Sequence, residues 1–274
     1  MTLQRRPRGR PRKEEESPSL SLSLSRGLTL LRTVAQHDGL TLTELSTLTG
    51  TPAASAYRLM VTLGNHGLVE WVDADQKWTI GVEALQIGFA FQRKARIALQ
   101  GRSHMQELME RTGETVNLAI LDDGEVVFIS QIECRETIRA FFRAGDRRPC
   151  HSSGIGKALL AELSVAKLDA VLKKRGLPSL TAKTITAKDK LTEELALIRR
   201  RGWSFDDQEG SDGMRCIAAA IFNEFHEAVG GISISGPVSR LPYDRVEALA
   251  SEVMSHAAAI TRAIGGVAPR EREP

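Results

Sequence analysis

The spacing of apolar residues between positions 26 and 81 predicts three short helices followed by a hairpin. Four apolar residues of the first helix recur at intervals of three and four positions and share one face: Leu28, Leu31, Val34 and Ala35. Gly39 stands just beyond them, where a glycine commonly ends a helix. We therefore expect this helix to begin at Arg26 and to bury that face.

Capping signals place the next two helices and the hairpin. Thr41 and Glu44 have the spacing of a capping box before a stripe of leucines. The following helix is expected to have Thr51 as its N-cap and Pro52 as its first residue, and to end near Gly67. The segments LVEW and KWTIG flank the turn VDADQ and predict a hairpin. This order, with a very short connection before the third helix, indicates a winged helix-turn-helix.

The rest of the chain mixes strand and helix patterns, which predicts an α+β fold with an antiparallel sheet. Residues 82–98 are amphipathic and are expected to form a connecting helix. Strands are expected at 115–121, 125–132, 137–143, 214–222 and 228–235, and helices near 156–162, 165–175, 188–201 and 241–264. The expected domains are a flexible basic arm (1–25), the winged helix-turn-helix (26–81), the connecting helix (82–98), a C-terminal domain (99–265) and a tail (266–274).

Positive charge is concentrated at the N-terminus. The chain has a net charge of +3, but residues 1–13 contain six Arg or Lys residues, so the rest of the chain sums to −3. The stretch PRGRP has the form of an AT-hook core, in which Arg8 and Arg10 lie along a narrow A·T-rich minor groove and Gly9 allows close approach. Such contacts separate A·T from G·C and little more. The arm is expected to hold DNA without selecting a sequence; the alternative is a disordered tail that aids solubility.

The helix that begins near Pro52 is expected to select the DNA sequence, because the second helix of a helix-turn-helix presents its N-terminal residues to base edges. The candidate contacts are Thr51, Ala53, Ser55, Tyr57 and Arg58. Arg58 can bind a guanine or a phosphate, and the alternative is a solvated helix residue. Residues 26–81 have a net charge of −1, so one copy should bind DNA weakly. We therefore expect two copies to bind one double-stranded, near-palindromic operator.

The composition argues against several other classes of protein. No apolar run approaches the roughly 20 residues that span a bilayer, so no membrane partner is expected. Three cysteines without CxxC spacing are typical of reduced thiols, which favours a cytoplasmic location, at the nucleoid when DNA is bound. The six histidines show no ligand spacing with cysteines or acids, so neither a metal nor another cofactor is expected.

Several stretches resemble the IclR family of bacterial transcriptional regulators. They include LTELSTLTGTPAASAYRLMVTLGNHGLVE, RRPCHSSGIGKALLA, RRRGWSFDDQEGSDGMRCIAAAIFNE and GGISISGPVSRLPYDRV, and the resemblance covers about residues 26–265. It implies a repressor or activator, not an enzyme, with a GAF-like domain that binds an effector. The implied effector is a small organic acid, glyoxylate or pyruvate, the implied targets are genes of glyoxylate and two-carbon metabolism, and the implied assembly is a homodimer or a dimer of dimers.

The resemblance also implies the effector-binding residues: Thr137, Ala140, Gly154, Ile155, Asp206, Met214, Cys216, Ser233 and Ser235. Ala140 is smaller and Ile155 larger than their counterparts in similar family members. Gly154 precedes a helix whose free amide groups would favour a carboxylate without the help of an arginine. Ser233 and Ser235 alternate along one strand, so both hydroxyls point to the same face.

Two interpretations of these residues stay open. Asp206 either accepts hydrogen bonds from a ligand hydroxyl, as hydrated glyoxylate would offer, or it caps a turn or pairs with Arg215. Cys216, His151 and Asp206 are also the residue types of a cysteine hydrolase or acyl-transfer enzyme, although no local signature accompanies the cysteine. An architectural DNA-binding protein led by the arm would leave the C-terminal domain without a role. The sequence therefore favours a regulator.

Overall fold

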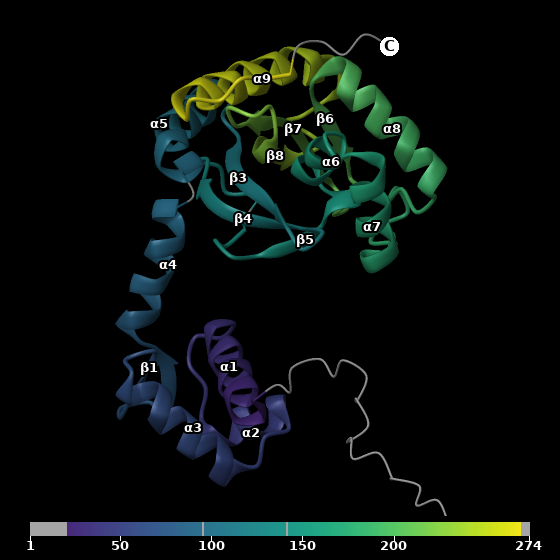
Figure 1. Ribbon diagram of the computed structural model, residues 1–274. Helices are drawn as coiled ribbons and strands as arrows, with labels where there is room; N and C mark the ends of the chain where they lie inside the picture. Colours follow the sequence, from purple (N-terminus) through teal and green to yellow (C-terminus); the bar gives the residue numbers. More distant parts are fainter. Residues whose placement is uncertain (1–20, 95, 141, 270–274) are drawn as a thin grey trace, which may run out of the picture. The chain divides into compact units, whose positions relative to one another are not determined.

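The computed structural model describes residues 21–94, 96–140 and 142–269 (Figure 1). Arg8, Gly9 and Arg10, the expected AT-hook residues, lie outside this range. The chain divides between Phe91 and Gln92 into two compact units, and each has an apolar core of its own.

The N-terminal unit is a winged helix-turn-helix, as the sequence predicts. Its elements are α1 (Leu22–Ala35), α2 (Leu42–Thr49), α3 (Ala53–Asn65) and the hairpin of β1 (Val69–Val72) and β2 (Lys77–Ile80). The capping box is confirmed, because the Glu44 amide donates to Thr41 Oγ1 at 3.3 Å and the Thr41 amide donates to Glu44 Oε2 at 2.8 Å. Gly50 ends α2 with a φ of 64°, a left-handed conformation that favours glycine.

The first helix begins earlier than expected, and its buried face, which includes Val34 as predicted, differs in part from the expected one. Ser21 caps α1 by accepting a hydrogen bond from the Leu24 amide at 3.5 Å, so residues 22–25, expected in the flexible arm, are helical. Leu30 is fully buried, whereas Leu28 is 42% exposed. Ser and Leu alternate at positions 19–25 of the sequence. This period of two residues is typical of a strand, so the pattern did not predict a helix here.

Thr51 is not the N-cap of α3, and that prediction was wrong. Pro52 occupies the cap position and the helix begins at Ala53, without a side-chain cap hydrogen bond. The backbone of Thr51 closes α2 instead: its amide donates to Thr49 Oγ1 at 3.3 Å, and its carbonyl accepts from Ser46 Oγ at 2.8 Å. The residue is held against α2, and this explains why it is only 5% exposed.

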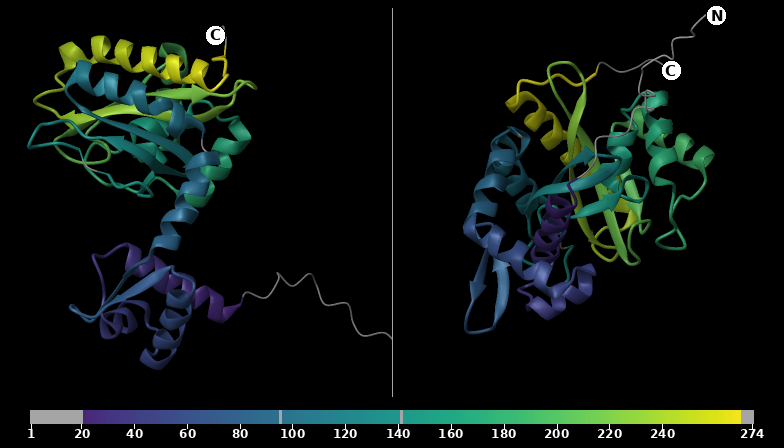
Figure 2. Two further views of the ribbon diagram at one scale, coloured as in Figure 1. Left: turned by 90° about the vertical axis from the view of Figure 1, so that its left-hand side faces the viewer. Right: turned by 60° about the horizontal axis from the view of Figure 1, so that its bottom comes forward.

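The C-terminal unit is an antiparallel sheet between two layers of helices (Figure 1 and Figure 2). The strand order is β5-β4-β3-β8-β7-β6. The strands are β3 (Thr115–Asp122), β4 (Glu125–Ile132), β5 (Arg147–Pro149), β6 (Ser204–Asp207), β7 (Met214–Phe222) and β8 (Ala228–Pro237). The helices are α5 (Arg96–Thr112), α6 (Gly154–Leu160), α7 (Val165–Arg175), α8 (Lys188–Arg201) and α9 (Val246–Ala263).

The two helical layers bury two separate apolar clusters. On one face α5 and α9 lie side by side, and Met105 and Val253 pack with Ile232 of the sheet (Figure 2). On the other face α6 and α8 pack over Ala218, with Leu159 and Leu195 in the cluster. The sheet therefore has one apolar core on each face, and α6 packs on the central strands β7 and β8.

The strand expected at 137–143 does not form in the residues that the structure describes there, 137–140 and 142–143. The backbone of Phe128 in β4 bonds to the loop beyond them instead: its carbonyl accepts from the Gly145 amide at 2.7 Å, and its amide donates to the Asp146 carbonyl at 3.0 Å. β5 then continues this edge. β6 was missed by the sequence analysis because SFDD is short and half acidic.

Two helix boundaries also differ from the prediction. The helix α4 (Val82–Lys94) follows the hairpin, but α5 already begins at Arg96, inside the expected connecting helix, and Ile97 is buried in the core of the C-terminal unit. The closing helix α9 begins at Val246 after a 3-10 turn (Tyr243–Arg245), and not at residue 241. Within the described ranges, the helices are too short or too polar to cross a bilayer.

Candidate functional site

A cavity of about 270 Å³ opens in the C-terminal unit between the sheet and the start of α6. Eight of the nine expected effector-binding residues line it: Ala140, Gly154, Ile155, Asp206, Met214, Cys216, Ser233 and Ser235. Thr137 is exposed and does not line this cavity. Segments that are far apart in the sequence thus meet at one hollow.

The start of α6 packs tightly against the neighbouring strand and turn. Ser153 caps the helix by accepting a hydrogen bond from the Gly156 amide at 3.4 Å. A Cβ atom at Gly154 would lie 2.6 Å from Cys216 Sγ, and one at Gly156 would lie 2.2 Å from the carbonyl oxygen of Cys150. Both glycines are therefore required by the packing of the protein itself, a reason that the sequence did not reveal.

β8 carries two hydroxyl groups to the cavity. Ser235 Oγ accepts a hydrogen bond from Asn117 Nδ2 at 3.2 Å. The Ser233 side chain is 1% exposed, and its Oγ makes no hydrogen bond of ordinary geometry to a described residue; the Cys216 thiol, a weak partner, interacts with it. Because a buried hydroxyl without a partner costs about 1–3 kcal/mol, a ligand oxygen placed beside Ser233 would recover that free energy.

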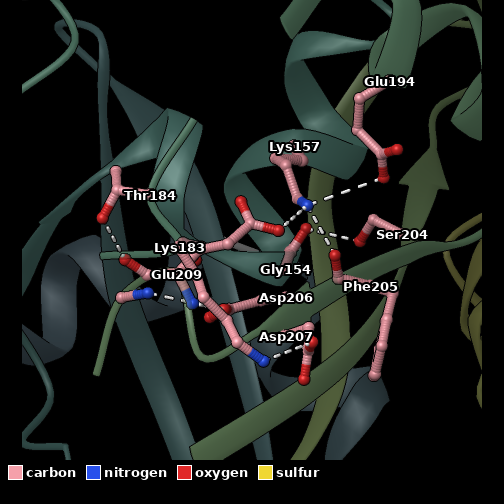
Figure 3. A network of polar contacts seen from close by, with 12 residues as sticks. Gly154, Lys157, Lys183, Thr184, Glu194, Ser204, Phe205, Asp206, Asp207 and Glu209 are labelled. Carbon is pink, nitrogen blue, oxygen red and sulfur yellow. Dashed lines mark hydrogen bonds and ion pairs between the residues drawn. The ribbon is translucent and has the colours of Figure 1, made fainter. Parts of the chain in front are cut away.

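Asp206 faces the cavity from β6, with one carboxylate oxygen held by the following loop (Figure 3). Its Oδ1 accepts hydrogen bonds from the amides of Glu209 at 2.6 Å and Gly210 at 3.4 Å, so it does cap a turn. Arg215 pairs with Asp207 at 2.7 Å rather than with Asp206. Burial, and next the negative charge of Glu209, raise the pKa of Asp206 to about 7. The carboxyl group is thus about half protonated at neutral pH.

Replacing Asp206 by Asn should stabilise the protein above pH 7 and leave its stability unchanged near pH 4. The folded state keeps the proton of Asp206 up to about pH 7, whereas an unfolded Asp loses it near 3.8, so the free energy of unfolding falls as the pH rises between these values. Removing this titration should add on the order of 2–4 kcal/mol at pH 8. Urea unfolding at pH 4 and pH 8 measures the gain, with Asp212→Asn on the exposed neighbouring turn as the control; an equal gain at both pH values would contradict the assignment.

Cys216, His151 and Asp206 do not form a catalytic constellation. His151 lines a different cavity, and its Nε2 lies 3.0 Å from the carbonyl oxygen of Pro178. Burial raises the pKa of the Cys216 thiol to about 11, and the charge of Asp206 acts in the same direction. Since the thiolate is the reactive form of cysteine, this arrangement does not favour the hydrolase interpretation.

Part of the cavity wall is aromatic and basic, which was not expected from the sequence. Phe128 and Phe142 line it, and their rings stack with centroids 4.2 Å apart. Arg148 lies over the Phe142 ring at 5.6 Å, and Arg139, also in the wall, pairs with Glu133 at 2.6 Å. The wall therefore contains arginines that the sequence-based expectation of an acid site did not include. The signal for Arg148 was its position directly before PCHSSGIGK, and Arg139 had no such signal.

The start of α3 presents the other candidate surface. Ala53, Tyr57 and Arg58 are exposed and Ser55 is partly exposed, as a helix that enters a groove requires. Thr51 differs from these four because its side chain is buried. Met60 of the same helix packs inward with the apolar core of this unit.

Both units match known family models. Residues 23–73 match the model described as the IclR helix-turn-helix domain, and residues 90–262 match the model described as the bacterial transcriptional regulator IclR C-terminal domain. The chain belongs to the IclR family. It is therefore a DNA-binding transcriptional regulator, and its winged helix-turn-helix is the family's DNA-binding domain.

Similar IclR-family proteins cover most of the chain. The transcriptional repressor IclR of Escherichia coli (strain K12) is 39% identical over 246 residues, which are 89% of this chain and 90% of that protein. The HTH-type transcriptional regulator BhcR of Paracoccus denitrificans (strain Pd 1222) is 40% identical over 276 residues, which are 99% and 98%. The crystal structure of the Thermotoga maritima IclR has a TM-score of 0.76 at 28% identity and covers 89% of this chain and 98% of that one. Both of these relatives are transcriptional regulators.

Proposed function

We propose that the cavity of the C-terminal unit binds a small organic acid, glyoxylate first and pyruvate second, and that this binding controls affinity for an operator. The observation that carries the proposal is the fully buried Ser233 hydroxyl, which makes no hydrogen bond of ordinary geometry to a described residue and lies in the wall of a cavity shared with Asp206 and Arg148. Genes of glyoxylate and two-carbon metabolism are the proposed targets.

The wall offers complementary groups for a short carboxylate. The hydroxyls of Ser233 and Ser235 can donate hydrogen bonds to carboxylate oxygens, and Arg148 adds positive charge at the same cavity. The apolar side is formed by Ile155 and Met214, which would pack against a short carbon chain. A site with few polar groups at defined positions and an otherwise apolar wall is typical of small-molecule pockets.

The apolar residues exposed on α4 support a homo-oligomer, a dimer or a dimer of dimers. Val82, Leu85, Ile87 and Phe91 are each more than half exposed in the single chain. Two DNA-binding domains in one assembly would read a near-palindromic operator with half-sites about 10 bp, or a multiple of it, apart. In this proposal the regulator acts in the cytoplasm, on the bacterial chromosome.

Substituting Ser233 by Ala tests the site directly. The variant loses the hydroxyl that would bond to the acid, so we expect the affinity for glyoxylate to fall by about 5–30-fold, which corresponds to about 1–2 kcal/mol. Calorimetric titration of the purified protein measures this, with Ser251→Ala on the exposed part of α9 as the control. Equal affinities in Ser233→Ala and the wild type would remove Ser233 from the site, and no binding of any C2–C4 acid would defeat the proposed function.

A further inference from the structure

A buried lysine lies directly behind the cavity wall. Lys157 belongs to α6, and its side chain is 1% exposed (Figure 3). Its Nζ donates to Glu209 Oε1 and to the Phe205 carbonyl, each at 2.5 Å, and lies 3.6 Å from Glu194 Oε1. A fully buried ammonium group is costly unless it is paired, so these contacts bind α6 to the loop that follows β6.

The same loop holds Asp206. The Glu209 amide donates to Asp206 Oδ1, while the Glu209 carboxylate bonds to Lys157. The loop itself is anchored from the other side, because Thr184 Oγ1 donates to the Glu209 carbonyl at 2.7 Å. Glu209 is therefore fixed at its amide, its carbonyl and its side chain, and this holds Asp206 Oδ1 in the loop while Asp206 lines the cavity.

The charged groups around Asp206 do not offset the negative charge of its ionised carboxylate. Glu209 Oε2 is buried without a hydrogen-bond partner among the described residues, so part of that negative charge stays near Asp206. Lys157 opposes it, but its ammonium group is already shared between Glu209 and Glu194. The pKa of Asp206 accordingly lies near neutrality.

The other charged or titratable groups near this carboxyl are already occupied or are not ionised. Arg215 of β7 pairs with Asp207, which also bonds to Lys183 and Tyr243. Cys216 of β7 stays a neutral thiol, and His151 before α6 lies at a different cavity. Of the three arginines in the cavity wall, Arg139 is paired with Glu133 and Arg215 with Asp207. Arg148 forms no ion pair with a carboxylate of the described residues. A ligand carboxylate placed beside Asp206 would meet this second carboxyl group, with Arg148 as the cation of the wall that is open to the ligand.

We propose that the cavity binds its carboxylate ligand together with one proton, held by Asp206 Oδ2 against the ligand, and that Glu209, paired with Lys157, is the positioning residue for this proton. The inference rests on the proposed function and specifies how that site takes an acid. The proton comes from the solvent and adds to the Asp206 carboxylate; the ligand stays a carboxylate, so the complex forms with a single hydrogen bond between the two groups and no covalent change. An O–H···O⁻ hydrogen bond is short and strong, whereas two ionised carboxylates within hydrogen-bonding distance repel each other.

A proton that binds with the ligand makes the affinity depend on pH in a defined way. With a pKa of about 7 in the free protein, about half of the molecules carry the proton at pH 7 and about a tenth at pH 8. The affinity for glyoxylate should therefore fall about two-fold between pH 6 and pH 7 and about five-fold between pH 7 and pH 8. At pH 8 about 0.9 proton should be taken up for each acid bound.

Calorimetry of the full-length protein with glyoxylate, in two buffers of different ionisation enthalpy at pH 6, 7 and 8, counts these protons. The Asp206→Asn variant keeps an acceptor for the loop amides and offers an N–H to the ligand, so it should bind glyoxylate with no proton uptake and with an affinity independent of pH. The Glu209→Gln variant removes the charge that favours the proton and leaves Lys157 to favour ionised Asp206, so the fall in affinity should begin at lower pH. Lys188→Met, on an exposed pair with Asp169, is the control and should follow the wild type.

The outcomes separate the inference from the proposed function. Proton uptake in the wild type that is lost in Asp206→Asn supports the inference. Binding without proton uptake, uptake that persists in Asp206→Asn, or loss of binding in that variant overturns it and leaves the proposed function standing; release of protons would instead mean that an ionised Asp206 accepts a hydrogen bond from hydrated glyoxylate. No binding to the wild type at any pH defeats the proposed function, and the inference with it. If Glu209→Gln does not fold, the wild type and Asp206→Asn still decide the question.

Discussion

Replacing Lys157 by Met is expected to destabilise the C-terminal unit by about 3–5 kcal/mol. The substitution removes the cation from a pocket in which Glu209 is 7% exposed and bonded to Lys157 at 2.5 Å, and it deprives the Phe205 carbonyl of its donor. A buried carboxylate left without its partner carries the full cost of its lost hydration. The midpoint of urea unfolding, followed by circular dichroism at pH 7.5, measures the effect.

The double variant Lys157→Met with Glu209→Met distinguishes the loss of pairing from the loss of packing. Since apolar residues of similar volume replace buried ion pairs at little cost, the double variant should recover most of the stability lost in the single one. Lys188→Met breaks an exposed ion pair with Asp169 and should change the stability by less than about 1 kcal/mol. If Lys157→Met unfolds at the wild-type urea concentration, the pair does not stabilise the loop that carries Asp206.

Replacing Arg58 by Ala is expected to weaken operator binding by about 10–100-fold, because a lost arginine contact with a guanine costs about 1–3 kcal/mol. Arg58 is exposed near the start of α3, two residues from the buried Met60 that fixes the helix to its core. Fluorescence anisotropy with DNA from the region upstream of the protein's own gene measures the affinity. Arg102→Ala, on an exposed position of α5, is the matched control and should bind as the wild type does.

The salt dependence of the same variant separates its two possible contacts. If Arg58 contacts a phosphate, the slope of log affinity against log salt should become shallower by about 0.9. If it contacts a base, the slope should stay the same and the loss should be confined to the cognate sequence. Wild-type affinity for the operator in Arg58→Ala would show that α3 does not read DNA through this residue.

Local signals in the sequence predicted the elements that local interactions define. The capping box of Thr41 and Glu44 forms as expected, and the bounds expected for α7, α8, β4 and β7 agree with those observed, because caps and apolar periodicity act within one element. The sequence-based predictions were wrong where contacts between segments distant in the sequence determine the structure. Phe128 takes its backbone partners from Gly145 and Asp146, so the apolar stretch at 137–143 has no strand to pair with.

The lining of the cavity, too, could be predicted from the sequence only in part. The resemblance to the IclR family indicated eight lining residues. Arg139 and Arg148 join them because the segment before β5 and β5 itself fold beside the cavity. The buried pair of Lys157 and Glu209 joins residues 52 positions apart, and neither stood out in the sequence because each looks like a solvated charge. The packing role of Gly154 likewise became visible only beside Cys216.

We propose above that a small acid in the cavity changes the affinity of the DNA-binding domain for its operator. The most direct measurement is the operator affinity of the purified protein, on DNA from upstream of its own gene, with and without saturating glyoxylate, pyruvate and other C2–C4 acids. We expect at least one acid to shift the dissociation constant of the operator complex by about 5–150-fold, the usual range of allosteric coupling. An operator affinity that stays the same with every acid would contradict it.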